Sequence, residues 1–427
     1  MLPLPPHRDL GNGLPNEILS TIFDYLSHDA LTRVALVSRR WRANAERVLY
    51  STIIIHEFQT MVMMLPAVPI TTLRCCETLF ARPRLTEYVR RFHIRWDTDV
   101  VESPLLLLRI AQNIVRTLVP SLVHLDSLEL SFGLAPHFPA SAYAPHNNAP
   151  QSPQSLENSP PPPASIPTPP DTQKPHGTAQ LHQLHHQLYH LPLLLPPLRL
   201  PSLRTLALHG IGTPPAPDLS RLLQNHPSLQ HLRLSDYRCA LHLTPADVPH
   251  LRSFRGYPAT AASLLPGRPV QALALVGCCE LATEEDLVRI ARGSVPVKAL
   301  DLSGMSVTPA LLRSVSRHLS QVEWLKVRLA LRYALSGSIV RHRLLTALTT
   351  VLAAFYNLRS LDLSPTNAND AMEEQHLCIT WLGACPSLRR VVFPSQTEWS
   401  LSEAGTWISG SGSRSPGSLP RWYLGAS

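Results

Sequence analysis

The chain has 427 residues, of which 44% are hydrophobic and 16% charged, and its formal net charge at pH 7 is +8. This length allows two or more domains with a sizeable core. The basic residues are scattered, with no run of five and no stripe interleaved with aromatic residues, so we expect no nucleic-acid partner. No window of eighteen consecutive apolar residues occurs, so we also expect no membrane span.

The cysteines and the N-terminal sequence indicate the compartment. There are seven cysteines, no CxxC motif, and two pairs that are adjacent in sequence, a poor spacing for zinc. The opening residues lack the long apolar stretch of a signal peptide. We therefore expect reduced thiols and a cytoplasmic or nuclear protein, or one found in both.

The first predicted unit spans residues 13–52, after residues 1–12, which we expect to be disordered. Three short helices are the natural interpretation of residues 14–50. The large apolar residues of the first helix fall on one face: Ile18, Leu19, Ile22, Phe23 and Leu26. Ser27 offers a cap for the second helix, and Ser38 can cap the third.

This unit is small for its number of apolar residues. Fewer than about forty residues bury too little surface to fold well alone. Each ordered residue costs on the order of 1–2 kcal/mol of backbone entropy, and a large apolar side chain returns roughly 1.5–3 kcal/mol only when fully buried. The physical argument leaves two alternatives open: a helical cap on the rest of the chain, and a docking module for another protein.

Residues 14–50 resemble an F-box in the order of their motifs. The matching segments are Leu14-Pro15, Glu17-Ile18-Leu19, Ile22-Phe23 with Leu26, Asp29-Ala30-Leu31, and Val37-Ser38-Arg39-Arg40-Trp41. The resemblance implies docking, through mainly apolar contacts, onto a Skp-type adaptor that holds the module on a cullin–RING ubiquitin ligase. The residues carried over to that contact are Leu14, Pro15, Ile18, Leu19, Ile22, Leu26, Leu31, Val34, Val37 and Trp41. Sequence alone does not separate those that face the adaptor from those that face the interior.

The rest of the chain repeats an apolar-x-x-apolar-x-apolar template, whose alternation is typical of a short strand. The template begins at Val89, Leu125, Leu203, Leu229, Val270, Val297, Val322, Leu358 and Leu388, with a degenerate copy at Leu251. From Leu203 onward the steps are 26, 22, 19, 27, 25, 36 and 30 residues. Helix-like stretches lie between the strands at 218–225, 284–292, 309–318 and 343–355.

Such strand-then-helix units resemble leucine-rich repeats, in which neighbouring units supply each other's core. The predicted fold class is α/β: a three-helix F-box followed by an irregular leucine-rich-repeat solenoid. Residues 53–132 hold the first repeat-like units, residues 198–400 the main array, and residues 401–427 a flexible C-terminal tail. The irregular repeat lengths resemble those of fungal-type F-box proteins.

One step, from Leu125 to Leu203, is 78 residues long, and 17 of the 42 prolines lie between Pro136 and Pro201. We interpret residues 133–197 as a disordered loop inserted into the solenoid, since long surface loops cost little closure entropy. Its histidines suggest filler more than a metal site: His176, His182, His185, His186 and His190. Its Pro-rich run could be a passive linker, a polyproline ligand or, at its Ser-Pro and Thr-Pro steps, a phosphorylation site.

No catalytic motif and no cofactor or metal site is predicted. Glu284, Glu285 and Asp286 suit a helix N-terminus, and Glu373-Glu374 with His376 favours a solvated helix face over acid–base chemistry. Two functions remain open: a non-catalytic substrate receptor of a ubiquitin ligase, and a non-degradative leucine-rich-repeat scaffold. The protein substrate is unknown, and the aromatic residues that could anchor it, although each more often lies in a core, are Trp324, Tyr333, Trp381 and Trp399.

Overall fold

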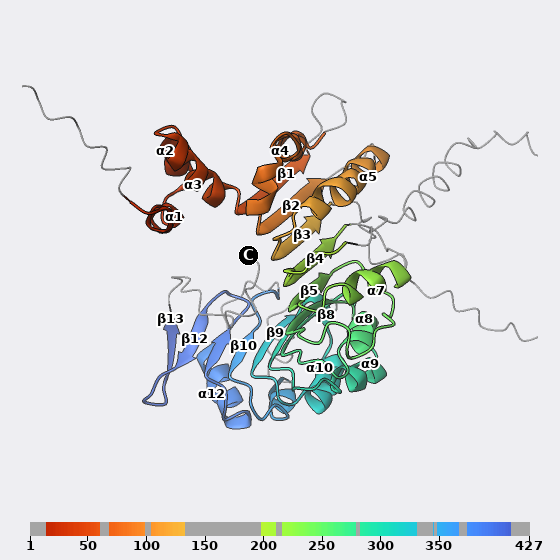
Figure 1. Cartoon of the computed structure of the whole chain (residues 1–427). Helices are drawn as coiled ribbons and strands as arrows, with labels where there is room; N and C mark the ends of the chain where they lie inside the picture. The colour runs from red at the N-terminus through yellow and green to blue at the C-terminus, as the bar shows by residue number, and fades with distance from the viewer. Residues whose placement is uncertain are drawn as a thin grey trace, which may run out of the picture. The chain divides into compact units, whose positions relative to one another are not determined.

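The protein is seen in a computed structural model that describes residues 14–59, 68–98, 104–132, 198–210, 216–278, 282–330, 345, 348–366 and 374–410. Three N-terminal helices are followed by one sheet whose 13 strands lie in chain order, β1 to β13 (Figure 1). Strands β1 to β11 pair in parallel, with helices between many of them. The predicted α/β fold class is confirmed.

The three N-terminal helices are α1 (Asn16–Asp24), α2 (His28–Val34) and α3 (Arg39–Leu49). The Ser27 hydroxyl accepts a hydrogen bond from the Ala30 N–H, and the Ser38 hydroxyl accepts one from the Trp41 N–H. Both serines therefore satisfy an N–H group that the first turn of a helix leaves without a partner. Both predicted caps are confirmed.

Every copy of the strand template forms a strand of the sheet. In chain order these are β2 (Arg91–Thr98), β3 (Ser127–Ser131), β4 (Thr205–His209), β5 (His231–Leu234), β6 (Ser253–Gly256), β7 (Ala272–Val276), β8 (Ala299–Val307), β9 (Trp324–Leu329), β10 (Ser360–Asp362) and β11 (Arg390–Val392). One further strand, β1 (Thr52–Gln59), precedes them. Its continuous run of isoleucines lacks the spacing of the template, so the template missed it.

The helices connect successive strands and lie along one face of the sheet (Figure 1). They are α4 (Ile70–Ala81), α5 (Pro104–Asn113), α7 (Ala216–Gln224), α8 (Pro258–Leu264), α9 (Glu284–Ile290), α10 (Pro309–His318) and α12 (Glu374–Ala384). Further connections are made by the 3-10 helices η2 (Pro83–Tyr88) and η4 (Val119–Ser121) and by the π-helical segment η3 (Ile114–Leu118). Within the described ranges, no helix combines the length and the apolar character that a membrane crossing requires.

A repeated main-chain contact ties the strands together where each begins. The Ser51 carbonyl accepts hydrogen bonds from the N–H groups of Arg90 and Arg91, at 2.8 and 3.0 Å. The same double contact to the next strand is made by the carbonyls of Arg90, Asp126, Arg204, Gln230, Arg252, Gln271, Lys298, Glu323 and Arg359. We call this series the carbonyl ladder.

The carbonyl ladder crosses the longest step of the chain without a break. The Asp126 carbonyl accepts from the N–H groups of Arg204 and Thr205, at 2.8 and 3.0 Å, and β3 and β4 are direct neighbours. In the described sheet β4 therefore follows β3 directly. The predicted disordered loop, residues 133–197, with its histidine cluster and proline-rich run, lies outside the described residues.

The Pro-Ser-Leu segments before some strands add a side-chain contact to the ladder. The Ser228 hydroxyl donates to the carbonyls of Pro201 and Leu203, at 3.0 and 2.9 Å, and the Ser387 hydroxyl donates to the Leu358 carbonyl at 2.9 Å. Each serine thus reaches back to the repeat before it. These serines supply polar contacts between successive repeats.

The array has one continuous hydrophobic core, whereas the N-terminal helices have a small core of their own. The large core extends from Ile53 in β1 to Trp407 near the end of the described chain. The small one consists of four fully buried residues: Leu19, Phe23, Leu31 and Ala45. The two clusters share no residue.

The flexible tail that we expected from residue 401 does not begin there. Strands β12 (Glu398–Leu401) and β13 (Trp407–Gly410) form an antiparallel hairpin on β11. Trp407 is buried in the large core, and the hairpin occupies the edge of β11 that the parallel array leaves unpaired. The hairpin escaped prediction because it follows no repeat template; residues 411–427 lie outside the described residues.

Candidate functional site

Helix α1 presents a stripe of large apolar side chains to solvent. Leu14, just before the helix, and Ile18, Ile22 and Tyr25 are all exposed, and Tyr25 is 88% exposed. Steps of three or four residues bring side chains to the same side of a helix, so these four lie in line. Isolated exposed apolar residues are ordinary, but a contiguous stripe marks an interaction surface. We call it the α1 stripe.

The structure separates the predicted contact residues that sequence left together. Leu19 and Leu31 are buried in the small core, so we assign them to the interior of the module. Leu26, Val34 and Trp41 are partly buried and pack against that core. The Trp41 ring lies 5.7 Å from the Phe23 ring in an edge-to-face contact, so Trp41 holds α3 against α1.

The other predicted contact residues, Leu14, Pro15, Ile18, Ile22 and Val37, are exposed. Val37 lies between α2 and α3 beside Leu36, which is 77% exposed. Sequence reasoning did not assign a contact role to Tyr25 or Leu36. The signal for Tyr25 was available, since it follows Ile22 by three residues in the same helical row; the signal for Leu36 was not, because it lies in a turn.

A polar network fixes α1 to α3 behind the α1 stripe. Arg40 donates from Nε to the Asn16 side-chain oxygen at 2.9 Å and from a second nitrogen to the Leu14 carbonyl. Buried Asn44 donates to the Asn16 side chain and to the Arg40 carbonyl, and accepts from the Ser20 hydroxyl. The buried polar groups thereby have partners, and the start of the stripe is held by α3.

The last helix of the module is also bound to the first repeat. Glu46 of α3 accepts from Arg84 of η2 at 3.1 Å and lies 3.8 Å from Arg82. The Glu46 carboxylate is mostly shielded while both arginines are exposed, so these ion pairs contribute little energy. Ser51, directly after α3, is the first member of the carbonyl ladder.

The aromatic residues named as possible substrate anchors lie in different environments. Trp381 is fully buried and stacks on Phe393 at 5.5 Å. Trp324 is buried with Ala272 and Ala299 in a small cluster separate from the large core. Trp399 is half-buried and donates to the Glu374 carboxylate at 2.8 Å. Tyr333 lies outside the described residues. Trp381 is therefore part of the core.

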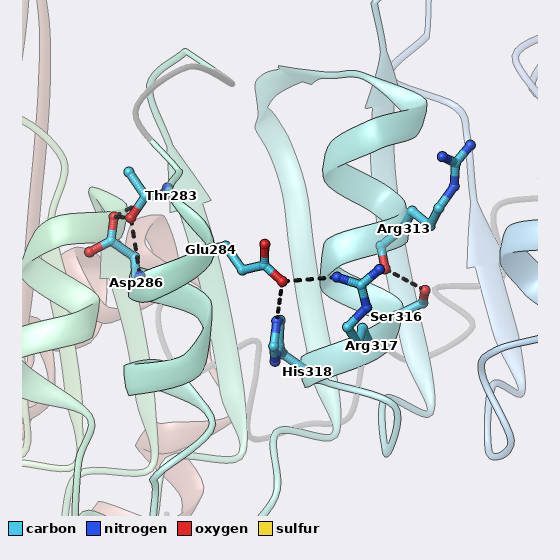
Figure 2. A network of polar contacts seen from close by, with 7 residues as sticks. All are labelled: Thr283, Glu284, Asp286, Arg313, Ser316, Arg317 and His318. Carbon is cyan, nitrogen blue, oxygen red and sulfur yellow. Dashed lines mark hydrogen bonds and ion pairs between the residues drawn. The ribbon is translucent and has the colours of Figure 1, made fainter.

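The acidic residues that we considered for catalysis have structural partners. Figure 2 shows the Thr283–Asp286 capping box and Glu284, which accepts from Arg317 at 2.9 Å and from the His318 ring at 3.1 Å. These bonds, strongest from His318, lower the pKa of Glu284 and connect α9 to α10. Glu374 is buried, in contrast to the solvated face we expected, because Ser395 and Trp399 donate to its carboxylate.

Thiol chemistry is disfavoured at the buried cysteines. Burial raises the pKa of Cys75 to about 11 and that of Cys76 and Cys378 to about 12. A neutral thiol is a poor nucleophile and a poor metal ligand. Among the residues that the structure describes, no three His, Cys, Asp or Glu side chains are grouped so that they could hold a metal ion.

Comparison with known proteins identifies the N-terminal module. The F-box-like family matches residues 12–56, which span α1 to α3 and the start of β1. No curated protein matches the chain. The chain is similar to two solved structures of low identity. The leucine-rich repeat domain of APL1B is 14% identical with a TM-score of 0.23, over 52% of this chain and 69% of that one. An internalin (inlF) from Listeria monocytogenes str. 4b F2365 is 11% identical with a TM-score of 0.27, over 87% of each chain.

Proposed function

We propose that this chain is the substrate-recognition subunit of a Skp–cullin–F-box type ubiquitin ligase. The observation that carries the proposal is the α1 stripe, which lies within the F-box-like domain. In this proposal the stripe, with Pro15, Leu36 and Val37, docks on a Skp-type adaptor, and through it on a cullin–RING ligase. The repeats bind a protein substrate. The fungal type of F-box protein and a cytoplasmic or nuclear location belong to the same proposal.

The physical support is the mismatch between the size of the module and its apolar surface. Its core contains four fully buried residues, while at least six large apolar side chains remain exposed: Leu14, Ile18, Ile22, Tyr25, Leu36 and Val37. Covering such side chains gains roughly 25 cal/mol for each Å² of apolar surface removed from water. The proposed role is non-catalytic, since a receptor contributes proximity between the substrate and the ubiquitin-carrying subunits.

The adaptor contact is tested with an isoleucine pair of matched exposure. Ile18 is 46% exposed on α1, and Ile54 is 54% exposed on β1 of the array. The purified chain and its Ile18→Ala and Ile54→Ala variants are titrated with a Skp-type adaptor by calorimetry. We expect Ile18→Ala to weaken binding about tenfold or more, as for a contact near an interface centre, and Ile54→Ala to bind like the parent.

Failure of the parent to bind the adaptor would contradict the proposal. Equal binding by both variants would move the docking surface away from the α1 stripe. Circular dichroism of each variant tests whether weaker binding reflects a loss of fold. We expect unchanged spectra, because both side chains are about half exposed.

A second measurement separates the receptor from the alternative, a non-degradative leucine-rich-repeat scaffold. Cells express either the parent or an Ile18→Ala/Ile22→Ala variant, and the half-lives of the proteins that copurify with both are compared. If the chain is a receptor, losing the adaptor contact lengthens the half-life of its substrates. Unchanged half-lives for every copurifying protein would favour the scaffold.

A further inference from the structure

Two arginines occupy directly paired positions at the centre of the sheet. Arg233 of β5 is in register with Arg255 of β6. The residues on either side of Arg233, Leu232 and Leu234, belong to the large core, so the arginines project from the opposite face. Neighbouring strands are about 4.8 Å apart, and like charges directly opposite each other destabilise a sheet.

Elsewhere on this face the array avoids such a pair. The row that contains Arg233 and Arg255 continues through Ala274 to Asp301, Lys326 and Asp362. From Asp301 to Asp362 the charges of the row alternate in sign, and the Lys326 ammonium lies 3.1 Å from the Asp362 carboxylate. Arg390 of β11 makes two hydrogen bonds to Glu398, at 2.6 and 2.9 Å. The like-charged pair is therefore an exception to the way this sheet arranges charge.

No carboxylate of the described chain forms an ion pair with Arg233 or Arg255. Asp236, two residues after β5, lies 3.3 Å from the His209 ring. Buried Arg268, by contrast, donates to three carbonyl groups. Both members of the arginine pair are half-buried.

Small, buried side chains flank the arginine pair. Ala207 is in register with Arg233 on one side, and Ala274 with Arg255 on the other. The next position of the row after Ala207 is Glu129, and the next position after Ala274 is Asp301. The result is a short basic site between two alanines, with an acid beyond each, which limits a bound segment to about the width of β4 to β7.

The charge of Arg233 reaches both neighbouring histidines of this face. Burial lowers the pKa of His93 and of His231, and the charge of Arg233 adds to the lowering in both, although Glu129 opposes it at His93. His231 is held by the Ser253 hydroxyl at 2.7 Å. Both imidazoles are thus disposed to be neutral near pH 7, and the positive potential of this face comes from the arginines.

We propose that Arg233 and Arg255 bind a carboxylate-bearing, extended peptide segment of a protein partner. Guanidinium groups bind carboxylates in a planar, two-bond geometry, and an acid placed between two adjacent arginines removes the repulsion that the empty site carries. The assignment of this segment as the substrate of the array rests on the proposed function. Its binding to the sheet does not require the adaptor.

The test uses the full chain and a fluorescein-labelled peptide of alternating Glu and Ser, with an otherwise identical Gln–Ser peptide as its neutral counterpart. Fluorescence anisotropy is measured for the parent, for Arg233→Gln/Arg255→Gln, and for Arg289→Gln/Arg292→Gln. The last variant changes the net charge equally, but Arg289 lies in α9 and Arg292 just after it, outside the sheet face of the pair. We expect the first variant to bind the acidic peptide about tenfold or more weakly, the control variant to bind like the parent, and added salt to weaken binding.

The proposal fails if the parent does not distinguish the acidic from the neutral peptide, or if both variants lose affinity equally, which would indicate net charge alone. A third peptide carries phosphoserine in place of Glu; binding of that peptide alone would overturn the carboxylate assignment. Adaptor titration of the same variants keeps the two proposals separate, because loss of peptide binding with unchanged adaptor binding leaves the proposed function standing.

Discussion

The N-terminal module and the repeat array use apolar residues in different ways. The array buries most of its apolar residues in one large core from Ile53 to Trp407. The module buries four residues completely and leaves the α1 stripe in water. The described array therefore has an extensive core of its own, whereas the module has a small core and keeps a row of large apolar side chains in water.

The difference follows from how the two regions are built. Stacking repeats adds a neighbour to each unit, so the buried share grows with the length of the array. Three short helices have no further neighbour to add, and small units bury a small fraction of their surface. We therefore expect substitutions to act through stability in the array and through binding on the α1 stripe.

The largest effect is expected in the core of the array. On helix α12, Leu377 is 2% exposed and Ile379 is 57% exposed. Leu377→Ala should lower the free energy of unfolding by about 2–5 kcal/mol, because it removes buried methyl groups and leaves a cavity. Ile379→Ala should change it by no more than about 0.5 kcal/mol. Urea unfolding followed by circular dichroism gives both values; similar losses would mean that α12 is not packed as described.

In the module, the difference in stability loss between a buried and an exposed substitution should be smaller, and confined to the module. Leu19 is 1% exposed beside Ile18, at 46%. Leu19→Ala should destabilise the module by about 2 kcal/mol, near the lower limit for such changes, because a small core relaxes around the gap. Hydrogen–deuterium exchange of peptides from residues 14–50 should rise, with the array unchanged. Ile18→Ala should leave exchange at the parent level; faster exchange there would place Ile18 in the core.

Helix caps allow the two regions to be compared with one chemical change. Ser38 caps α3 of the module, and Thr283 caps α9 of the array in a capping box. Replacing either by Ala should cost about 1 kcal/mol. Hydrogen exchange should report the loss over α3 in the first case and over α9 in the second. If Ser38→Ala accelerates exchange in the array as well, the two regions unfold together, and the comparison drawn above is wrong.

Acid should weaken the array by a smaller amount. Burial lowers the pKa of His93, His226 and His231 below the ordinary 6.5. The unfolded chain then binds more protons than the folded chain, so stability is lost as pH falls below about 6.5. Fully buried His226 accepts from the Leu200 N–H. The melting temperature should fall between pH 7.5 and 5.5, and His226→Gln should reduce that fall; an unchanged slope would contradict the assignment.

Much of the array was predictable because the alternation of leucines within a few residues is enough to indicate a strand. The ten template copies all became strands, whereas β1 and the β12–β13 hairpin, which lack the template, were missed. In the module, the sequence analysis grouped Ile18 with Leu19 on one helical face, and only the packing of α3 shows which of the two is covered. The arginine pair was within reach of sequence reasoning, because Arg233 and Arg255 occupy the same position in consecutive copies of the template. The strand register agrees with that alignment.

The carbonyl ladder has a consequence for how this chain can be cut and rejoined. At the step from Asp126 to Arg204 the sheet is held by main-chain hydrogen bonds and by the pairing of β3 with β4, not by the peptide that connects them. Two polypeptides, one ending after β3 and the other beginning before β4, carry the whole interface between them. Coexpressed, such halves should reassemble into one sheet, and a circular permutant with new termini there should fold. Evolution could lengthen or shorten this segment by the same freedom, so it is a natural place for the chain to gain new sequence.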